Sequence, residues 1–517
     1  TRIAMRPTLR WALFSAIAIA AVAPQARADD FVDRVDSYYK DVAASQRSDT
    51  VLLPLLVKVA APPAAVASVN SAALLPASSA SFAAASAWAT AEPQKDALEA
   101  LKKVTSQTEW KKAFAFAQPY SFAAVDPDLV IANAYTFLGD PPTLASARHL
   151  YLPLLNQLAS LVHVEATRLA AEGKPADALD LIIRLTFLAR SMADRAFMQE
   201  QTWGYDTMVL GLQRLRDIAY VDSRSANPVL TPDQLKDITE RLQDRAGLMG
   251  TDRLLLPRGD KVAAEQIISQ LFIPRGGPNP DTFGRSLARI GSKERPLRLF
   301  SETARWDGVL KLHANELDAR AQLEAIYNDW AKRWQLSPFE PIQRAPSDYS
   351  RLDKTRYAAL DAVLGDLGVL TTRRLELRAE MAATRTALGM YAFARANRTF
   401  PRDITAIRPS FLAKMDADPF SPEGKNPEFF VPIRDALKRP NEDPKPHEIQ
   451  IFPATGDPFA VSLRDDQFVI FLIGSDRAAN NARKATQMVE DRAGDFLVWP
   501  PVLSLVRQNL TETGRLN

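Results

Sequence analysis

Regularly spaced apolar residues predict helices over most of the chain, from about residue 93 to residue 397. Residues 144–171 carry apolar side chains about 3.6 residues apart, which places them on one helical stripe: Leu154, Leu155, Leu158, Leu161, Val162 and Leu169. The next segment repeats this spacing at Leu181, Leu185, Leu188 and Met192. Gly173 and Pro175 lie between the two segments, where glycine suits the end of one helix and proline the first turn of the next. The pattern therefore predicts an antiparallel helical hairpin.

The other helical segments do not repeat this hairpin regularly. The loop at 170–179 resembles that of one tetratricopeptide-type unit, but no second copy follows at a period of about 34 residues. A further helix is predicted to begin at Thr231, a good N-terminal capping residue, and others to cover roughly residues 303–336 and 353–397. We therefore expect an irregular helical-hairpin domain at residues 96–345 instead of a regular solenoid.

The segment before this helical region has a different composition. Residues 29–95 are rich in alanine and proline, and residues 60–89 carry almost no charge. Two interpretations stay open for this N-terminal segment: small-residue helices packed closely on their neighbours, or an extended linker.

After Phe400 the helical pattern gives way to prolines, glycines and short β-prone runs. Residues 448–452 and 467–473 are such runs, and the second is apolar enough to be a buried strand. A small sheet attached to the last long helix is the simplest interpretation. The expected fold class is mainly α: the helical-hairpin domain followed by a small α+β domain at residues 346–517.

The first 28 residues have the three parts of a bacterial signal peptide. Arg6 and Arg10 form a cationic start, an apolar run follows at 11–23, and the small-residue pattern Ala26-Arg27-Ala28 ends the segment. We expect cleavage near Ala28 and a mature protein in the periplasm or outside the cell. The apolar run has about 13 residues, fewer than the roughly 20 that a membrane-spanning helix needs. Retention as an N-terminal anchor is the alternative.

Composition excludes several classes of function. Without the four arginines of the signal, the 64 basic residues become 60, which face 61 acidic residues and leave a net charge near −1. A chain without an excess of positive charge has no general affinity for phosphate backbones, so we expect no nucleic-acid partner. The chain contains no cysteine, which rules out disulfides, thiolate catalysis and cysteine-ligated metal sites.

Four short motifs near the C-terminal end follow one another in a characteristic order. They are Ala387-Leu388-Gly389-Met390-Tyr391, then Phe400-Pro401 with Ile404, Ile407, Pro409 and Leu412 behind it, then Asp418-Pro419-Phe420-Ser421, then Phe468 to Asp476. Together they resemble the globular part of the major type II secretion pseudopilins, over about a fifth of the chain. The resemblance implies a pseudopilin-like α+β domain in which a long helix packs on a small sheet. It does not imply filament formation, because a cleavable signal and a long helical region replace the pilin helix here.

The same resemblance implies a calcium site at Asp476 and Asp495. In the family, the loop after the last strand is rich in glycine and aspartate, whereas this loop carries the cations Arg477, Arg483 and Lys484. Positive charge opposes a divalent cation, which needs several carboxylate or carbonyl oxygens. We expect no cofactor, with calcium at Asp476 and Asp495 as the alternative.

Known catalytic motifs are missing from the sequence. The four histidines, at 149, 163, 313 and 447, form no metal-binding pattern, and nucleophile-elbow, phosphate-loop and dinucleotide-binding glycine motifs do not occur. Trp203 with Tyr205, and Trp330 with Trp334, are interpreted as core or interface residues instead of carbohydrate platforms.

A basic segment begins in the proline- and glycine-rich loop at 274–280. It contains Arg275, Arg285, Arg289 and Arg298. We expect either a solvated loop or a docking patch for anionic lipid or an acidic partner, and the second would give peripheral membrane contact.

These observations favour an exported, non-catalytic envelope protein that binds another envelope protein or acts as an assembly scaffold. The alternative is an exported hydrolase or glycan-binding protein whose site lies in the cleft between the helical and the α+β domains. A long apolar groove would favour the first function, and converging acids or a metal would favour the second.

Overall fold

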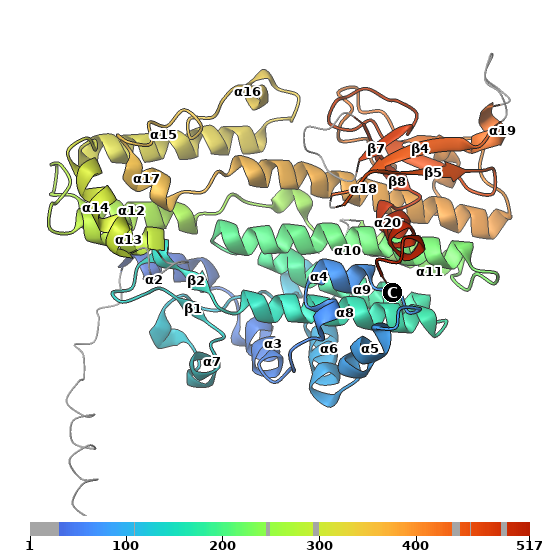
Figure 1. Cartoon of the computed structure of the whole chain (residues 1–517), viewed down its shortest axis with the longest axis horizontal. Coiled ribbons are helices and arrows are strands. Elements are labelled where there is room, and N and C mark those ends of the chain that lie inside the picture. Colours follow the sequence, from blue (N-terminus) through green and yellow to red (C-terminus); the bar gives the residue numbers. More distant parts are fainter. Residues whose placement is uncertain are drawn as a thin grey trace, which may run out of the picture.

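The computed structural model describes residues 30–107, 109–243, 249–292, 299–436, 445–454, 456–486 and 494–516. Helices make up most of it, and a small mixed sheet lies near the C-terminal end (Figure 1). The prediction of a mainly α protein with a small sheet is confirmed. The predicted signal peptide, residues 1–28, and Arg298 lie outside the described residues. No helix within the described ranges combines the length and the apolar composition needed to cross a membrane.

Three long helices form the centre: α8 (Leu152–Ala171), α9 (Pro175–Met192) and α10 (Met198–Arg224). The first two are the predicted hairpin, and Gly173 in their loop has φ +77°, a left-handed conformation that glycine adopts without strain. α10 is enclosed by its neighbours, so that charged side chains are buried along it: Glu200, Arg214, Arg216 and Asp217. Each of these charges is close to an oppositely charged group, as buried charges require.

The alanine- and proline-rich segment forms helices, not an extended linker. Its helices are α2 (Asp30–Asp36), α3 (Ser48–Leu56), α4 (Val69–Leu74), α5 (Phe82–Ala89) and the beginning of α6 (Glu92–Val104). Ala72 of α4 and Ala85 of α5 are fully buried, and both helices pack against α8. Small side chains thus allow close packing on the central hairpin. α7 (Pro127–Ile131) and a short ladder of β1 (Thr136–Phe137) with β2 (Arg148–His149) complete this side of the molecule.

α11 (Pro232–Leu242) begins at the predicted cap. The Thr231 hydroxyl accepts a hydrogen bond from the Gln234 N–H at 3.2 Å, and the Gln234 side chain accepts one from the Thr231 N–H at 2.9 Å. Further helices are α12 (Gly259–Leu271), α13 (Phe283–Ser292), α14 (Leu299–Leu310), α15 (Glu316–Gln335), α16 (Pro341–Arg344) and α17 (Ala358–Val363). The helix predicted at 303–336 is divided, because Asn315 caps α15 by accepting a hydrogen bond from the Asp318 N–H at 2.8 Å.

The C-terminal part consists of α18 (Gly368–Asn397), the short helix α19 (Pro432–Ala436), six strands and α20 (Val502–Glu512). The strands are β3 (Glu428–Phe430), β4 (His447–Phe452), β5 (Phe459–Leu463), β6 (Val469–Leu472), β7 (Lys484–Thr486) and β8 (Asp495–Trp499). Their order in the sheet is β3-β6-β8-β7-β4-β5, with β7 parallel to both of its neighbours and all other pairs antiparallel.

The two faces of this sheet belong to different cores. Ile470 and Val498 on one face join the main core, where α18 packs on β6 and β8. Phe471 and Leu497 on the other face form a second, smaller core with Val502 and Leu505 of α20. α18 also packs along α10 and α11, so the main core extends without a break from the N-terminal helices to the sheet. The division into domains at 345/346 remains a prediction.

Candidate functional site

In the described part of the chain β5 is an edge strand, and one side of its backbone has no partner strand there. Ala460 lies opposite Gln450, and Ser462 lies opposite Glu448. The Gln450 N–H donates to the Arg483 C=O at 2.8 Å, toward β7 and away from β5. In an antiparallel pair, two opposite residues either both direct their backbone N–H and C=O groups toward each other or both direct these groups away. Ala460, and two residues later Ser462, therefore direct their N–H and C=O groups away from β4.

A groove of about 930 Å³ follows this edge. Residues 460–463 of β5, four in succession, line it. Successive side chains of a strand point to opposite faces, so four consecutive lining residues indicate a groove that runs along the backbone edge. The facing wall belongs to α20 and the end of α10, with Tyr220, Val221, Arg224, Leu505, Gln508 and Thr511 among its residues. Figure 1 shows α20 beside the sheet at this end.

A buried charge fixes the wall of the groove. Asp217 of α10 accepts hydrogen bonds from the Ser504 hydroxyl at 2.6 Å and from both terminal nitrogens of Arg507 at 2.6 and 2.8 Å. Burial by itself raises the pKa of Asp217, but the charges of Arg507 and Arg214 hold that pKa well below its usual range. Arg507 also donates to two C=O groups at the end of α4. α20 is thus bound to both α10 and α4.

β5 itself carries none of three features that often protect an exposed edge. Natural edge strands carry charges, prolines or bulges that prevent pairing with another chain. Phe459–Leu463 contains no charged residue and no proline, and its register with β4 is unbroken. Within the described ranges, no hydrogen bond reaches the outward N–H and C=O groups of Ala460 and Ser462. The groove can therefore hold an extended polypeptide segment by strand addition.

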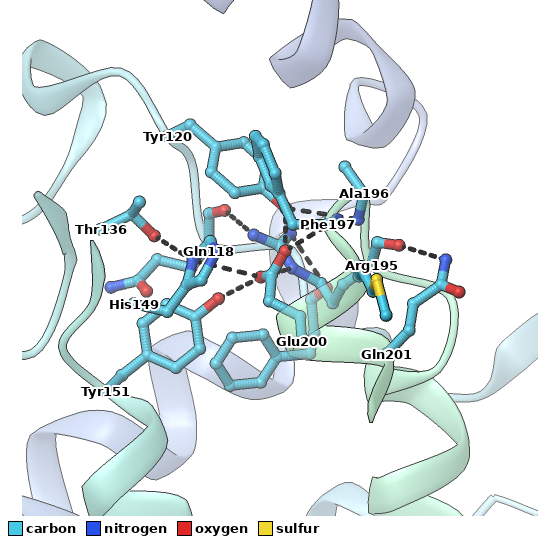
Figure 2. A network of polar contacts seen from close by, with 12 residues as sticks. Gln118, Tyr120, Thr136, His149, Tyr151, Arg195, Ala196, Phe197, Glu200 and Gln201 are labelled. Atoms are coloured by element: carbon cyan, nitrogen blue, oxygen red, sulfur yellow. Dashed lines mark hydrogen bonds and ion pairs between the residues drawn. The ribbon is translucent and has the colours of Figure 1, made fainter. Parts of the chain in front are cut away.

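A second buried polar centre lies at the start of α10 (Figure 2). Glu200 accepts hydrogen bonds from the Tyr120 hydroxyl at 2.6 Å, the Arg195 Nε at 2.7 Å, the Phe197 N–H at 3.2 Å and the Tyr151 hydroxyl. Burial alone raises the pKa of Glu200, but the charge of Arg195 and the hydrogen bonds keep that pKa below its usual value.

Residues of these types also occur in active sites, but here they are buried and connect separate segments of the chain. The side chains of Arg195 and Glu200 have no exposed surface, so solvent and substrate cannot reach the carboxylate. His149 Nδ1 is 3.9 Å from Glu200 and 3.1 Å from the Thr136 hydroxyl. Figure 2 shows the side chains converging on Glu200 from separate segments. The centre therefore holds the strand β2, the loop near Tyr120 and α10 together.

The two candidate calcium ligands lie near each other: Asp495 begins β8, and Asp476 lies in the loop after β6. Asp495 accepts a hydrogen bond from the Ala482 N–H at 2.6 Å, and Asp476 accepts one from the Gly494 N–H at 2.9 Å. Burial, and then the charges of Asp476 and Asp418, raise the pKa of Asp495 to about 6. Among the described residues, no group of three or more acidic or histidine side chains is placed to hold a metal ion. Calcium binding at Asp476 and Asp495 stays the untested alternative to the expectation of no cofactor.

The predicted basic patch is described only in part, because Arg298 lies outside the described residues. Arg275 lies in the loop before α13, where its N–H donates to the Glu316 carboxylate at 2.6 Å. Arg285 and Arg289 are exposed and stand four residues apart on α13, which places them on one side of that helix. Docking of an acidic partner or of anionic lipid at these arginines stays a prediction.

Sequence reasoning did not single out the β5 groove or the Glu200 centre. The alternation of larger and smaller residues in Phe-Ala-Val-Ser-Leu indicates a strand, but strand order decides whether it is an edge. Glu200 and Arg195 are ordinary charged residues in the sequence, and only their burial distinguishes them.

Comparisons of the chain with protein-family models, with curated proteins and with solved structures found no match. The functional proposal therefore rests on the geometry of the chain itself.

Proposed function

We propose that this chain is an exported, non-catalytic envelope protein that binds an extended segment of a partner polypeptide and serves in assembly or as a scaffold. The unpaired edge of β5 carries the proposal. Ala460 and Ser462 each offer one N–H donor and one C=O acceptor to the groove. A partner strand alongside β5 satisfies these groups and extends the sheet.

The walls of the groove give the partner's side chains specific surroundings. Val221 is an exposed apolar residue of the α10 wall, while Gln508 and Thr511 of α20 are polar. Because alternate residues of an added strand point to opposite sides, every second side chain of the partner faces this wall. Anchoring of α20 through Asp217 keeps the wall in place before binding, which reduces the ordering cost of association.

Export and the pseudopilin-like identity of the C-terminal part belong to the same proposal. The N-terminal sequence pattern supports export. A long helix packed on a small sheet, as the resemblance implies, is supported by the contacts of α18 with β6 and β8. The Asp-Pro-Phe motif also has a structural role here, because Asp418 accepts hydrogen bonds from the Phe420 and Ile473 N–H groups, both at 2.8 Å.

Peptides selected from a random displayed library on the full mature protein provide the test. Ser462→Pro removes one outward N–H without breaking a bond to β4, and proline is tolerated at such edge positions. We expect it to weaken binding of selected peptides at least about fivefold, the equivalent of one hydrogen bond. Ser462→Thr keeps the N–H and favours strand geometry, so it is the matched control and should bind normally.

Equal binding by the wild type and Ser462→Pro, at equal melting temperature, would show that the peptides bind elsewhere. If sedimentation instead shows that the protein alone forms dimers that Ser462→Pro dissociates, β5 pairs with a second copy, and the proposed heterologous partner is wrong.

A further inference from the structure

Three large apolar side chains are more than half exposed around the helices α12 to α15. Ile273 lies two residues after α12 and is 51% exposed, and Leu312 lies two residues after α14 and is 63% exposed. Leu317, the second residue of α15, is 59% exposed. Single exposed apolar residues are common, whereas a group of them marks an interaction site. These three residues are called the apolar patch below.

Contacts between the two loops bring the members of the apolar patch together. The Glu316 N–H donates to the Gly276 C=O at 2.9 Å, which joins the beginning of α15 to the loop after α12. Phe272 and His313, each the chain neighbour of a patch residue, are buried, and their ring centroids are 5.3 Å apart. The apolar patch is therefore one surface and not three separate residues.

The loop that carries Ile273 is held by its own backbone. The Gly276 N–H donates to the Ile273 C=O at 2.7 Å, and the Ile273 N–H donates to the Gly277 C=O at 3.1 Å. At the base of the loop, the Asn279 N–H donates to the Leu271 C=O at 2.7 Å. The fold thus presents the Ile273 side chain to solvent, and little ordering is needed when another surface covers it.

Two cations flank the apolar patch. Lys311 directly precedes Leu312, and Arg275 lies two residues after Ile273. Both residues are exposed, and neither side chain has a hydrogen bond or an ion pair with another described residue. Each of these two loops therefore presents an apolar side chain and a positive charge close together.

The acids beside the patch are already paired. The Glu316 carboxylate accepts hydrogen bonds from the Arg275 N–H at 2.6 Å and from the Arg320 Nε at 2.9 Å, and Asp318 lies 3.2 Å from Arg356. Over residues 273–320, which include the arginines of α13, nine basic residues face six acidic ones. This end of the chain is positive, although the mature protein as a whole is close to neutral.

Apolar and cationic side chains placed next to each other fit the boundary of a lipid bilayer. There, a layer of charged headgroups lies directly above the acyl chains, so apolar side chains enter the second layer while lysine and arginine reach the first. Each cation near an anionic bilayer adds to the attraction. A neutral, purely apolar partner would leave both cations without a counter-charge.

We infer that the apolar patch, with Arg275 and Lys311, docks this protein on a bilayer that contains anionic phospholipid. The three apolar side chains enter the boundary between headgroups and acyl chains, and the two cations bind lipid phosphates. Figure 1 shows α13 and α14 at one end of the molecule and β5 with α20 at the other. The inference therefore does not rest on the proposed function of the β5 groove.

Cosedimentation of the full mature protein with lipid vesicles tests the inference. We expect more protein to bind vesicles of phosphatidylglycerol and phosphatidylcholine than vesicles of phosphatidylcholine alone. Salt at about 0.5 M should weaken this binding, because it screens charges at the membrane surface. Absence of binding to the anionic vesicles would overturn the inference, and equal binding to both kinds of vesicle would overturn the role of the cations.

Variants locate the docking surface. Leu312→Asp should weaken binding to anionic vesicles about tenfold or more, because one apolar side chain no longer enters the bilayer. Val369→Asp is the matched control, since Val369 is 47% exposed in the first turn of α18 and lies outside both loops. Arg275→Glu combined with Lys311→Glu should also weaken binding about tenfold or more.

Unchanged vesicle binding in Leu312→Asp, or equal losses in Leu312→Asp and Val369→Asp, would overturn the assignment to the apolar patch. Sedimentation velocity of the protein alone provides a second readout. Dimers that Leu312→Asp dissociates would show that the patch pairs two copies of this chain, and docking on lipid would then be wrong.

Discussion

Replacing Glu200 by alanine tests the role assigned to the buried centre at the start of α10. The change removes the acceptor of hydrogen bonds from two tyrosine hydroxyls, one N–H group and the Arg195 guanidinium. Arg195 keeps its bond to the Gln118 C=O at 2.8 Å but loses the only carboxylate paired with it in the described structure. A positive charge is then left in the interior without a directly paired carboxylate.

The size of the effect follows from that unpaired charge. Removing one partner of a buried ion pair costs about 3–5 kcal/mol of unfolding free energy. Two unpaired tyrosine hydroxyls act in the same direction, but contributions within one network are not additive. We therefore expect a loss of about 4 kcal/mol, a large part of the stability of a typical domain.

Urea denaturation followed by tryptophan fluorescence measures the loss. Glu200→Gln keeps one acceptor oxygen and should cost less than Glu200→Ala. Arg195→Met combined with Glu200→Leu removes both charges, and its cost should be smaller than the sum of the two single costs. Glu99→Ala is the control, since it breaks an exposed pair with Lys102 and should change stability by less than about 0.5 kcal/mol. A cost below about 1 kcal/mol for Glu200→Ala would refute this account of the centre.

Three further predictions follow. The pKa of Asp217 is lowered in the folded state, so its ion pair stabilises the protein above the unfolded pKa of about 3.9, and this stability is lost as the pH falls further. Asp217→Asn should therefore cost about 3 kcal/mol of unfolding free energy at neutral pH. Below about pH 4, the urea midpoint of this variant should depend less on pH than that of the wild type. If Asp476 and Asp495 bind no calcium, as the cation-rich loop favours, millimolar calcium should leave the melting temperature unchanged, whereas a stabilisation that Asp476→Ala abolishes would establish the site. Mass spectrometry of the native protein should find its N-terminus at or near Asp29, and recovery of an uncleaved N-terminal segment from the envelope would contradict the signal assignment.

The sequence pattern predicted those helices and strands that are determined by residues close together in the chain. The hairpin of α8 and α9 follows from apolar spacing and from Gly173, and the start of α11 follows from the Thr231 cap. The apolar run at 467–473 contains the buried strand β6. In each case the residues that determine the element are within a few positions of one another.

Features that depend on distant residues could not be predicted in this way. Apolar spacing suggested a helix from residue 144, but α8 begins at Leu152, because the preceding residues include β2, which pairs with β1. Asp217 and Arg507 are 290 positions apart, and nothing near either of them indicates the other. The edge position of β5 likewise results from the order of strands that are separate in sequence.

Site-resolved hydrogen exchange at β5 tests the central claim most directly. In the free protein, the amides of Ala460 and Ser462 should exchange rapidly, because they point into the groove, whereas the amide of Val461 should be protected by its bond to β4. A bound peptide should slow exchange at Ala460 and Ser462 and leave Val461 protected as before. Peptide binding that leaves exchange at Ala460 and Ser462 unchanged would contradict strand addition at this edge.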